Sequence, residues 1–479
     1  MIAANSSLLP PEEHVLSTLE RDGSRRWLKP RVSPGRFWHH RRWVAYALIA
    51  VFTLVPFTRI HGKQTILLDI AARRFTIFGY TFLPTDTLLL ALFMVFMLLS
   101  IFLATALFGR VWCGWACPQT VYLEFVFRPI ERLLERTAGR GGRAKQPVPP
   151  WRVALKYLLF ALISLHLANT FLAYFVGVDR LAQWTRQSPL THPIPFLIVA
   201  AVTGLMLFDF GYFREQLCII ACPYGRFQSV LLDRSSLIVS YHARRGEPRG
   251  RATKDVRSAE LPVLGDCVDC KLCVATCPTG IDIRQGLQME CINCTQCIDA
   301  CDAVMRKLGR APGLIRYSSQ AADRGSPYRW LRARTLIYPL MLGLIASGFV
   351  LVFASQKSFD AMLFREPGIP NTMTADGHVQ NLMRLKLTNR TEAAASYRVG
   401  MLAPRSALAQ LTEPEILLDP GETRTFHVQV LCDPQEFHNG HSPARLAVDG
   451  DRQERIELSF QLIGPYDVGP PTSTALPPK

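Results

Sequence analysis

The sequence predicts an α-helical multi-span membrane domain with an inserted α+β module and a C-terminal all-β sandwich. Three observations support this fold class. Apolar runs long enough to cross a bilayer occur between residues 41 and 354. Twelve of the 13 cysteines lie in four short clusters, which is typical of metal or cluster sites and not of a disulfide framework. Beyond residue 355, apolar residues alternate with polar ones, as in half-buried strands.

Composition and charge exclude both a disordered protein and a soluble single-domain protein. Of the 479 residues, 49% are hydrophobic and 19% are charged. The net charge is +16, yet residues 355–479 carry a net charge of −3, so the excess lies on the part with the apolar runs. Basic residues that flank membrane spans explain this distribution better than nucleic-acid binding does, and no nucleic-acid partner is expected.

Five segments are expected to cross the membrane, because a helix of roughly 20 apolar residues spans about 30 Å of hydrocarbon. They are Trp43–Phe57, Thr87–Phe108, Tyr157–Val178, Ile194–Phe213 and Leu336–Ala354. Residues 41–230 would form a membrane domain with four helices, and residues 336–354 would be the fifth. Residues 1–40 show no secretory signal, so the first span is interpreted as an uncleaved anchor.

The distribution of Lys and Arg predicts the orientation of these spans. The basic connections hold 8, 8 and 19 Lys or Arg, in residues 1–42, 109–155 and 210–335. The alternate connections hold four and two, in residues 58–83 and 178–193. The positive-inside rule therefore places the N-terminal segment 1–40 and both larger basic connections in the cytoplasm, with residues 355–479 outside.

Two cysteine runs in residues 263–305 predict a bacterial two-cluster ferredoxin module. Three thiolates spaced two residues apart hold three corners of a cubane, and the fourth cysteine points to the neighbouring cluster. The runs therefore assign one 4Fe-4S cluster to Cys267, Cys270, Cys273 and Cys301. They assign the other to Cys291, Cys294, Cys297 and Cys277. We call these the first and the second cluster.

Two structural zinc sites are the alternative, but zinc takes two pairs of ligands and fits repeated four-cysteine runs less well. Disulfides are not expected in a cytoplasmic segment.

One departure from the ferredoxin pattern is visible, because Asp302 stands where the first run has Pro278. The polar, basic residues 242–262 are predicted to tether this module to the fourth span.

Two further cysteine pairs form an internal repeat, each at the predicted cytoplasmic end of a span. They read Cys113-Gly-Trp-Ala-Cys117-Pro and Cys218-Ile-Ile-Ala-Cys222-Pro. The spacing places both sulfurs of a pair on one face if the segment is helical. The proline suits the first turn of a following helix, where the pKa of a thiol is lowered. Four convergent thiolates suit Cu(I), another iron–sulfur centre or zinc, whereas the alternative is four thiols that simply pack at helix ends.

Other polar candidates are weaker. His166 and Asn169 lie within the third span and Asp209 lies near the end of the fourth, where they could contact a quinone or a haem or hydrogen-bond between helices. Glu124 is interpreted as a solvated or capping acid. In residues 355–479 short alternating strands and turn signals predict a β-sandwich without a catalytic constellation, for which a docking role is expected.

The two CxxxCP pairs, the double cysteine run, the further span and the C-terminal sandwich together resemble the CcoG/FixG/RdxA family of cytochrome c oxidase accessory proteins. The resemblance covers nearly the whole chain beyond the first ~35 residues. It implies a bacterial inner-membrane protein with a periplasmic immunoglobulin-like domain at residues 355–479. It also implies a role in the maturation of cbb3-type oxidases, through reduction of Cu(II) to Cu(I) before copper insertion.

Carried over to this chain, the resemblance makes the eight ferredoxin cysteines the cluster ligands. It makes four thiols the catalytic and copper-handling residues, namely Cys113, Cys117, Cys218 and Cys222. The implied partners are the oxidase with its copper-delivery factors, membrane lipid, and a cytoplasmic or quinol electron donor. Two alternatives remain, a quinol-oxidising membrane ferredoxin that supplies a reductase, and an assembly scaffold without redox activity.

Overall fold

The computed structural model describes residues 17–465 except for short gaps. These gaps are 20–21, 23, 73, 83–85, 138–139, 143, 145, 251–263, 326–331, 356, 392, 412, 414 and 452–453. Much of the predicted tether and of the N-terminal segment therefore lies outside the described residues. The chain divides into two compact units, Met1–Phe349 and Val350–Lys479, each of which is described by itself.

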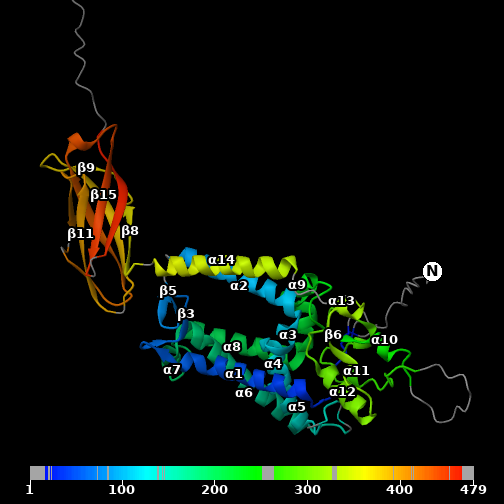
Figure 1. The fold of residues 1–479 in the computed structure, drawn as a ribbon. Coiled ribbons are helices and arrows are strands. Elements are labelled where there is room, and N and C mark those ends of the chain that lie inside the picture. The colour runs from blue at the N-terminus through cyan, green and yellow to red at the C-terminus, as the bar shows by residue number, and fades with distance from the viewer. Residues whose placement is uncertain are drawn as a thin grey trace, which may run out of the picture. The chain divides into compact units, whose positions relative to one another are not determined.

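Long helices form where the apolar runs predict them (Figure 1). They are α1 (Arg36–Leu54), α2 (Thr87–Phe108), α6 (Pro150–Val176), α8 (Pro193–Phe208) and α14 (Ala333–Ala354). A π-helical turn, η3 (Asp209–Phe213), extends α8. Four helices of the described part are long and apolar enough to cross a membrane: α2, α6, α8 with η3, and α14. The prediction of a multi-span membrane domain is confirmed at these four positions.

Helix α1 departs from the prediction of five apolar spans, because its first half carries charge. Arg41 and Arg42 shorten its apolar stretch, and the Arg41 side chain is packed inside the protein. The start of α1 donates backbone hydrogen bonds to Asp299 in the cysteine module. Near its end, the Phe52 carbonyl accepts a hydrogen bond from the Tyr174 hydroxyl of α6, at 2.7 Å. The helix therefore runs beside α6, but its first half carries a buried charge, Arg41.

The connection between α1 and α2 contains short strands that the sequence pattern did not predict. A hairpin is formed by β1 (Arg59–Ile60) and β2 (Lys63–Gln64). An antiparallel three-stranded sheet follows, with β3 (Ile66–Asp69), β4 (Arg74–Ile77) and β5 (Tyr80–Phe82). Strands of two to four residues are too short for a period-two pattern to be recognised. The short helix α7 (Val178–Trp184), which has about two turns, connects α6 to α8.

Short helices follow both α2 and η3 and carry the CxxxCP pairs. After α2 come α3 (Val111–Trp115), α4 (Pro118–Tyr122), the π-helical η2 (Leu123–Phe127) and α5 (Arg128–Leu134). After η3 come the π-helical η4 (Leu217–Ala221) and α9 (Pro223–Leu231). Each proline of a CP pair opens a helix, as predicted, because its missing N–H would have no partner in the first turn.

The cysteine module is closed by a two-stranded antiparallel sheet. Strand β6 (Ile238–Tyr241) pairs with β7 (Ile315–Ser318), so chain on both sides of the cysteine runs contributes to the module. Between the strands lie α10 (Ala243–Gly246), α11 (Leu272–Ala275), the 3-10 turn η5 (Ile283–Gln285) and α12 (Gln296–Lys307), and α13 (Gln320–Asp323) follows β7. The apolar core of this module includes Val239, Ile281, Ile283, Ile298, Met305 and Ile315.

The second unit is the predicted β-sandwich. One sheet has the order β12 (Leu408–Leu411), β14 (Thr423–Cys432), β10 (Val379–Asn389) and β8 (Phe359–Arg365), with β9 (Thr372–Met373) also paired to β10. The other has the order β13 (Ile416–Leu418), β11 (Ala395–Ala403), β15 (His441–Gly450) and β16 (Arg455–Ile463). Alternate residues of β10 and β14 are buried between the sheets, which confirms the period-two pattern.

Candidate functional site

The two ferredoxin loops have the same unusual backbone. The second and fourth residues after the first cysteine of each run have positive φ angles: Asp269, Lys271, Asn293 and Thr295. Left-handed residues at these places curl each loop, and turns of this kind point backbone N–H groups into a concavity that suits anions and iron–sulfur centres. Such conformations are uncommon for residues other than glycine, so their repetition indicates a shared role.

The module encloses two small hollows lined by cysteine. Cys267, Cys270, Cys273 and Cys301 line the first hollow. Cys277, Cys291, Cys294 and Cys297 line the second, with Cys273 also at its edge. The last cysteine of each run therefore lies with the first three of the other run. This arrangement matches the crossed assignment, and the ligand set itself stays a prediction.

The donor set fits 4Fe-4S clusters better than single metal ions. In the described part of the chain, no three His, Cys, Asp or Glu side chains converge closely enough to bind one ion. A tetrahedral zinc site needs thiolates about 2.3 Å from a common centre, which these loops do not provide. Burial raises the pKa of Cys291 to about 11 and that of Cys273 to about 12, so these thiols must lose protons when they bind iron.

Asp302 is accommodated because helix α12 continues through it. In the first run, Pro278 follows a chain that has already left its helix. In the second run, Cys301 and Asp302 lie within α12, and the Asp302 carboxylate accepts a hydrogen bond from the Gly313 N–H at 2.8 Å. The departure from the ferredoxin pattern therefore stabilises the turn that leads into β7 and leaves Cys301 at the first hollow.

The two CxxxCP pairs lie close together, although neither forms one continuous helical face. Cys113 is in α3, but Cys117 is the extended residue that precedes α4. Cys218 is in η4, and Cys222 precedes α9 in the same way. All four thiols are near enough to influence one another's ionisation. They do not close on a single point, since none of the described side chains form a group of three for one ion.

Burial determines the ionisation of these thiols, contrary to the predicted helix-terminus effect. Removal from water raises the pKa of Cys113 to about 11, and it also raises the pKa of Cys117 above its usual range. The predicted lowering of the pKa at the helix N-terminus is therefore wrong for Cys117. Its helix has only five residues and the thiol is mostly buried, so loss of hydration outweighs the helix dipole.

A buried glutamine fixes the Cys113 side chain. The Cys113 thiol donates to the Gln228 side-chain carbonyl at 3.0 Å. The Gln228 amide donates in turn to the hydroxyls of Thr105 at 3.2 Å and Tyr224 at 2.5 Å. Gln228 thus connects α2, α3 and α9, which carry both halves of the repeat. The only signal for Gln228 in the sequence is its position six residues after Cys222, on the helix that Pro223 begins, and this position alone did not predict its role.

The first CxxxCP pair packs directly on the loop of the second cluster. Cys113 forms an apolar contact group with Ile292 and Cys294. A Cβ atom added at Gly114 would lie 2.5 Å from the Ile292 carbonyl oxygen and 2.9 Å from the Asn293 carbonyl carbon. Only glycine therefore permits this approach of two backbones. A membrane-side thiol and a cluster cysteine are thus packed side by side.

A buried network of ion pairs joins the repeat to the module. The Arg128 guanidinium, whose side chain is 2% exposed, pairs with Glu124 and with Glu215 at 3.1 Å. It also donates to the Pro278 carbonyl, just after Cys277, at 3.4 Å. Glu124 was interpreted as a solvated or capping acid, and that interpretation is wrong. It lies one helical turn before Arg128 and neutralises a buried charge.

We expect Glu124 to make the stability of the fold depend on pH in the acidic range. Burial opposes its ionisation, but the nearby positive charges of Arg128 and Arg132 outweigh that cost, and the pKa of Glu124 lies below its ordinary 4.5. A lowered pKa stabilises the fold above about pH 4.5 and this contribution disappears as the pH falls through the folded-state value. Glu124→Gln should therefore lower the thermal unfolding midpoint most at pH 7, with a smaller difference from wild type near pH 4. A difference independent of pH would contradict this.

The intramembrane candidates have different environments. Asn169 donates to the Leu165 carbonyl of its own helix at 2.9 Å, and the His166 ring is exposed on the outer face of α6. Asp209 instead accepts a hydrogen bond at 3.1 Å from Gln119, which follows Cys117 and Pro118 in the chain. Of these three candidates, Asp209 alone contacts the segment with the cysteine pairs.

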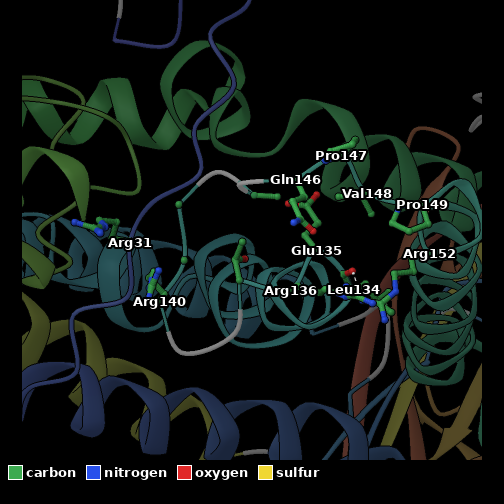
Figure 2. Close-up of a pocket in the computed structure, with 14 residues that line it drawn as sticks. Arg31, Leu134, Glu135, Arg136, Arg140, Gln146, Pro147, Val148, Pro149 and Arg152 are labelled. Atoms are coloured by element: carbon green, nitrogen blue, oxygen red, sulfur yellow. Dashed lines mark hydrogen bonds between the residues drawn. The ribbon is translucent and has the colours of Figure 1, made fainter.

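A wider hollow, of about 660 Å³, lies over the connection between α5 and α6, and none of the cysteines line it (Figure 2). Among the described residues, four arginines line it: Arg31, Arg136, Arg140 and Arg152. Glu135 also lines it and is paired with Lys29 at 2.6 Å and Lys156 at 3.5 Å. The positive charge at the start of α6 suits the border of a membrane that contains anionic lipids.

Family models match three parts of the chain. Residues 90–137 match a 4Fe-4S binding domain, and residues 213–320 match a 4Fe-4S dicluster domain. Residues 349–465 match the immunoglobulin-like fold found at the C-terminus of FixG. The predicted fold class is confirmed, with apolar helices, an iron–sulfur module and an immunoglobulin-like domain. The first of these matches also covers the Cys113 and Cys117 pair.

Three relatives are similar over long parts of the chain. The protein RdxA of Cereibacter sphaeroides is 32% identical over 390 residues, which are 78% of this chain and 81% of RdxA. The protein RdxB of the same organism is 31% identical over 426 residues, 84% of this chain and 88% of RdxB. The nitrogen fixation protein FixG of Rhizobium meliloti is 38% identical over 307 residues, 62% of this chain and 57% of FixG.

Proposed function

This chain belongs to the family of RdxA, RdxB and FixG, and from that premise we propose that it reduces Cu(II) to Cu(I) for the assembly of a cbb3-type oxidase. At the coarser level it is a membrane iron–sulfur protein that transfers electrons, and an oxidoreductase. The observation that supports the finer proposal is the packing of Cys113 against Cys294 across Gly114.

The chemistry requires one electron and a suitable destination for the reduced ion. Bound 4Fe-4S clusters supply single electrons over a range of potentials set by charge and hydrogen bonds. Cu(II) prefers nitrogen and oxygen ligands, whereas Cu(I) prefers soft thiolates. Cys113, Cys117, Cys218 and Cys222 would therefore favour Cu(I) as it forms, and a copper ion that enters between them would draw their sulfurs together. In each turnover one Cu(II) gains one electron, and any thiol that binds Cu(I) releases its proton.

We expect the protein, once reduced, to consume Cu(II) without any other reductant. The clusters are reduced with dithionite, excess reductant is removed anaerobically, and Cu(II) is added. The Cu(II) EPR signal should disappear, up to about two equivalents per chain, because each of two clusters supplies one electron. A Cu(I)-specific chelator should report the same amount.

The thiol part of the proposal is tested with a matched pair of variants. Replacing Cys113, Cys117, Cys218 and Cys222 together with serine should slow copper reduction by about tenfold or more, because the soft ligands are gone. Cys432→Ser is the control, since this buried thiol lies in β14 of the other unit. An unchanged rate in the fourfold variant, with both clusters present, would contradict the role of the thiols.

A quinol is a second candidate partner, as the source of electrons. The Asp209 carboxylate lies at the end of a predicted span and is held by Gln119, beside the first cysteine pair. Oxidation of a quinol releases protons as well as electrons, and an intramembrane carboxylate suits proton transfer. Reduction of the clusters by a quinol in membranes, with a rate that Asp209→Asn lowers and that copper leaves unchanged, would favour this donor.

The remaining assignments are part of the same proposal. The positive-inside rule supports a cytoplasmic module and a periplasmic immunoglobulin-like domain in a bacterial inner membrane. The oxidase and its copper-delivery factors would be the partners, and the immunoglobulin-like domain formed by β8 to β16 would dock them.

A further inference from the structure

We infer that Arg41 raises the reduction potential of the second cluster above that of the first, and that the second cluster is therefore the electron exit towards Cys113. This inference rests on the proposed function, because it gives the direction of electron flow through that site. It concerns a side chain of the membrane domain that contacts the module.

Arg41 is a buried charge with no ion pair in the described part of the chain, although its guanidinium lies over the Phe125 ring, 5.6 Å from the centroid. Arg41 is 1% exposed. The Nε atom donates to the Gly114 carbonyl at 2.9 Å, but neither Nη1 nor Nη2 has a hydrogen-bond partner among the described residues. A guanidinium with two unsatisfied nitrogens in a protein interior is costly unless an anion accepts its remaining hydrogens.

The second cluster and its thiolate ligands would supply the anion that the buried guanidinium of Arg41 requires. Gly114, to which Arg41 is bound, packs on the backbone between Cys291 and Cys294. Cys294 belongs to the same apolar contact group as Cys113, which directly precedes Gly114. Because Arg41 is bound to Gly114 and so to the loop of the second cluster, its charge would act on that cluster, and Nη1 and Nη2 have no hydrogen-bond partner among the described residues.

The acids nearest to Arg41 have other partners. Asp299 accepts backbone hydrogen bonds from Phe37 at 3.2 Å and Trp38 at 2.7 Å. Glu124 pairs with Arg128 and, at 3.8 Å, with Arg132. The positive charge of Arg41 is therefore not cancelled by a direct ion pair in the described part of the chain.

The surroundings of the first cluster differ in charge. Arg284 and Lys271 line the first hollow, but Lys271 is exposed to solvent, and Arg284 pairs with Asp282 at 2.6 Å and with Asp269, so its charge is compensated. Near the second hollow, the guanidinium of Arg110 donates to the carbonyl of Met289, two residues before Cys291, and adds a further positive charge. Positive charge and N–H donors at sulfur stabilise the more negative, reduced form of a cluster and raise its potential.

The difference in potential would give electron transfer a direction, from the first cluster to the second. A low-potential donor reduces the first cluster, and the electron moves to the second because the potential is higher there. Cys294 of that cluster packs against Cys113, so the electron arrives beside the thiols. From there it reduces Cu(II) to Cu(I), so that the donor loses one electron for each copper ion reduced and both clusters return to their oxidised state.

The test is an EPR-monitored redox titration of the full-length protein without copper. Two midpoint potentials are expected, and Arg41→Gln should lower the higher one while the lower one stays fixed. We expect a change of about tenfold in the partition of the electron between the clusters, which is about 59 mV for one electron. Arg42→Gln is the matched control, since the Arg42 guanidinium lies over the Trp38 ring, 4.7 Å from its centroid.

Other results have defined meanings. Unchanged potentials in Arg41→Gln, or a fall of the lower potential in place of the higher, overturn the inference. Arg41→Lys keeps the charge without the two-pronged donor and should shift the same potential less. If Arg41→Gln does not assemble its clusters, the potentials of Arg41→Lys provide the test. An unshifted higher potential in Arg41→Lys then overturns the inference. Selective loss of the second cluster from both variants supports it, and loss of both clusters from both overturns it. Because no copper is present, a failure of copper reduction would leave the measured potentials standing.

Discussion

Replacing Cys301 with alanine will remove the cluster held by the first cysteine run and spare the cluster held by the second run, although Cys301 belongs to the second. The reason is the crossed arrangement, in which Cys301 lines the hollow of Cys267, Cys270 and Cys273. The purified variant should contain about half the iron and acid-labile sulfide of wild type. It should transfer no electron from a low-potential donor to copper, since one of two clusters in series is missing.

The spectra of matched variants make this prediction specific. Cys301→Ala and Cys267→Ala should leave the same EPR signal, that of the second cluster. Cys277→Ala and Cys294→Ala should both leave the other signal. If Cys301→Ala instead resembles Cys294→Ala, each run binds its own cluster and the crossed assignment is wrong. Full iron content in all four variants would rule out the assignment as a whole.

Replacing Arg128 with methionine will strongly destabilise the first unit and loosen the module from the membrane helices. The substitution removes the closest partner of the buried Glu124 and Glu215 carboxylates. It leaves them only longer pairs, Glu124 with Arg132 at 3.8 Å, and Glu215 with Arg25 at 3.4 Å and Arg214 at 3.6 Å. Breaking a buried ion pair in this way typically costs about 3–5 kcal/mol. The expected result is a large fall in the temperature at which the iron–sulfur absorbance is lost, and faster proteolysis between the module and the helices.

An exposed ion pair provides the control. Arg59 pairs with Asp179 at 2.7 Å, but these side chains are 57% and 77% exposed. Arg59→Met should therefore change stability by only about 0–1 kcal/mol. A second comparison is the variant Arg128→Met with Glu124→Gln and Glu215→Gln, which removes the charges together and should recover part of the loss. Equal effects of Arg128→Met and Arg59→Met would show that the buried network contributes no more than a surface pair.

Features that depend only on residues close together in the chain could be predicted from the sequence. The apolar runs gave four of the five helices, and the alternation around Phe426 and Leu458 gave the sandwich. The cysteine runs indicated both hollows because a ferredoxin loop takes its shape from local spacing. Pro118 and Pro223 correctly marked the starts of helices.

Features that depend on distant segments could not be predicted. Gln228 and Cys113 are 115 residues apart, and nothing in either local sequence indicates their hydrogen bond. Arg41 stands just before an apolar run in the sequence, but its side chain is buried because α1 packs against the module as well as against α6. The pKa of Cys117 was misjudged for the same reason, since a short helix offers a weak field and burial is a tertiary property.

Gly114 sets the separation across which the proposed electron transfer from the second cluster towards Cys113 would take place. Electron tunnelling slows exponentially as the barrier between two centres becomes thicker, and two main chains in contact would set the thickness of this barrier. A single methyl group at this position would push them apart. Nearby charges can change the potentials of the centres. The separation of the two main chains, in contrast, is fixed by Gly114, because glycine has no side chain.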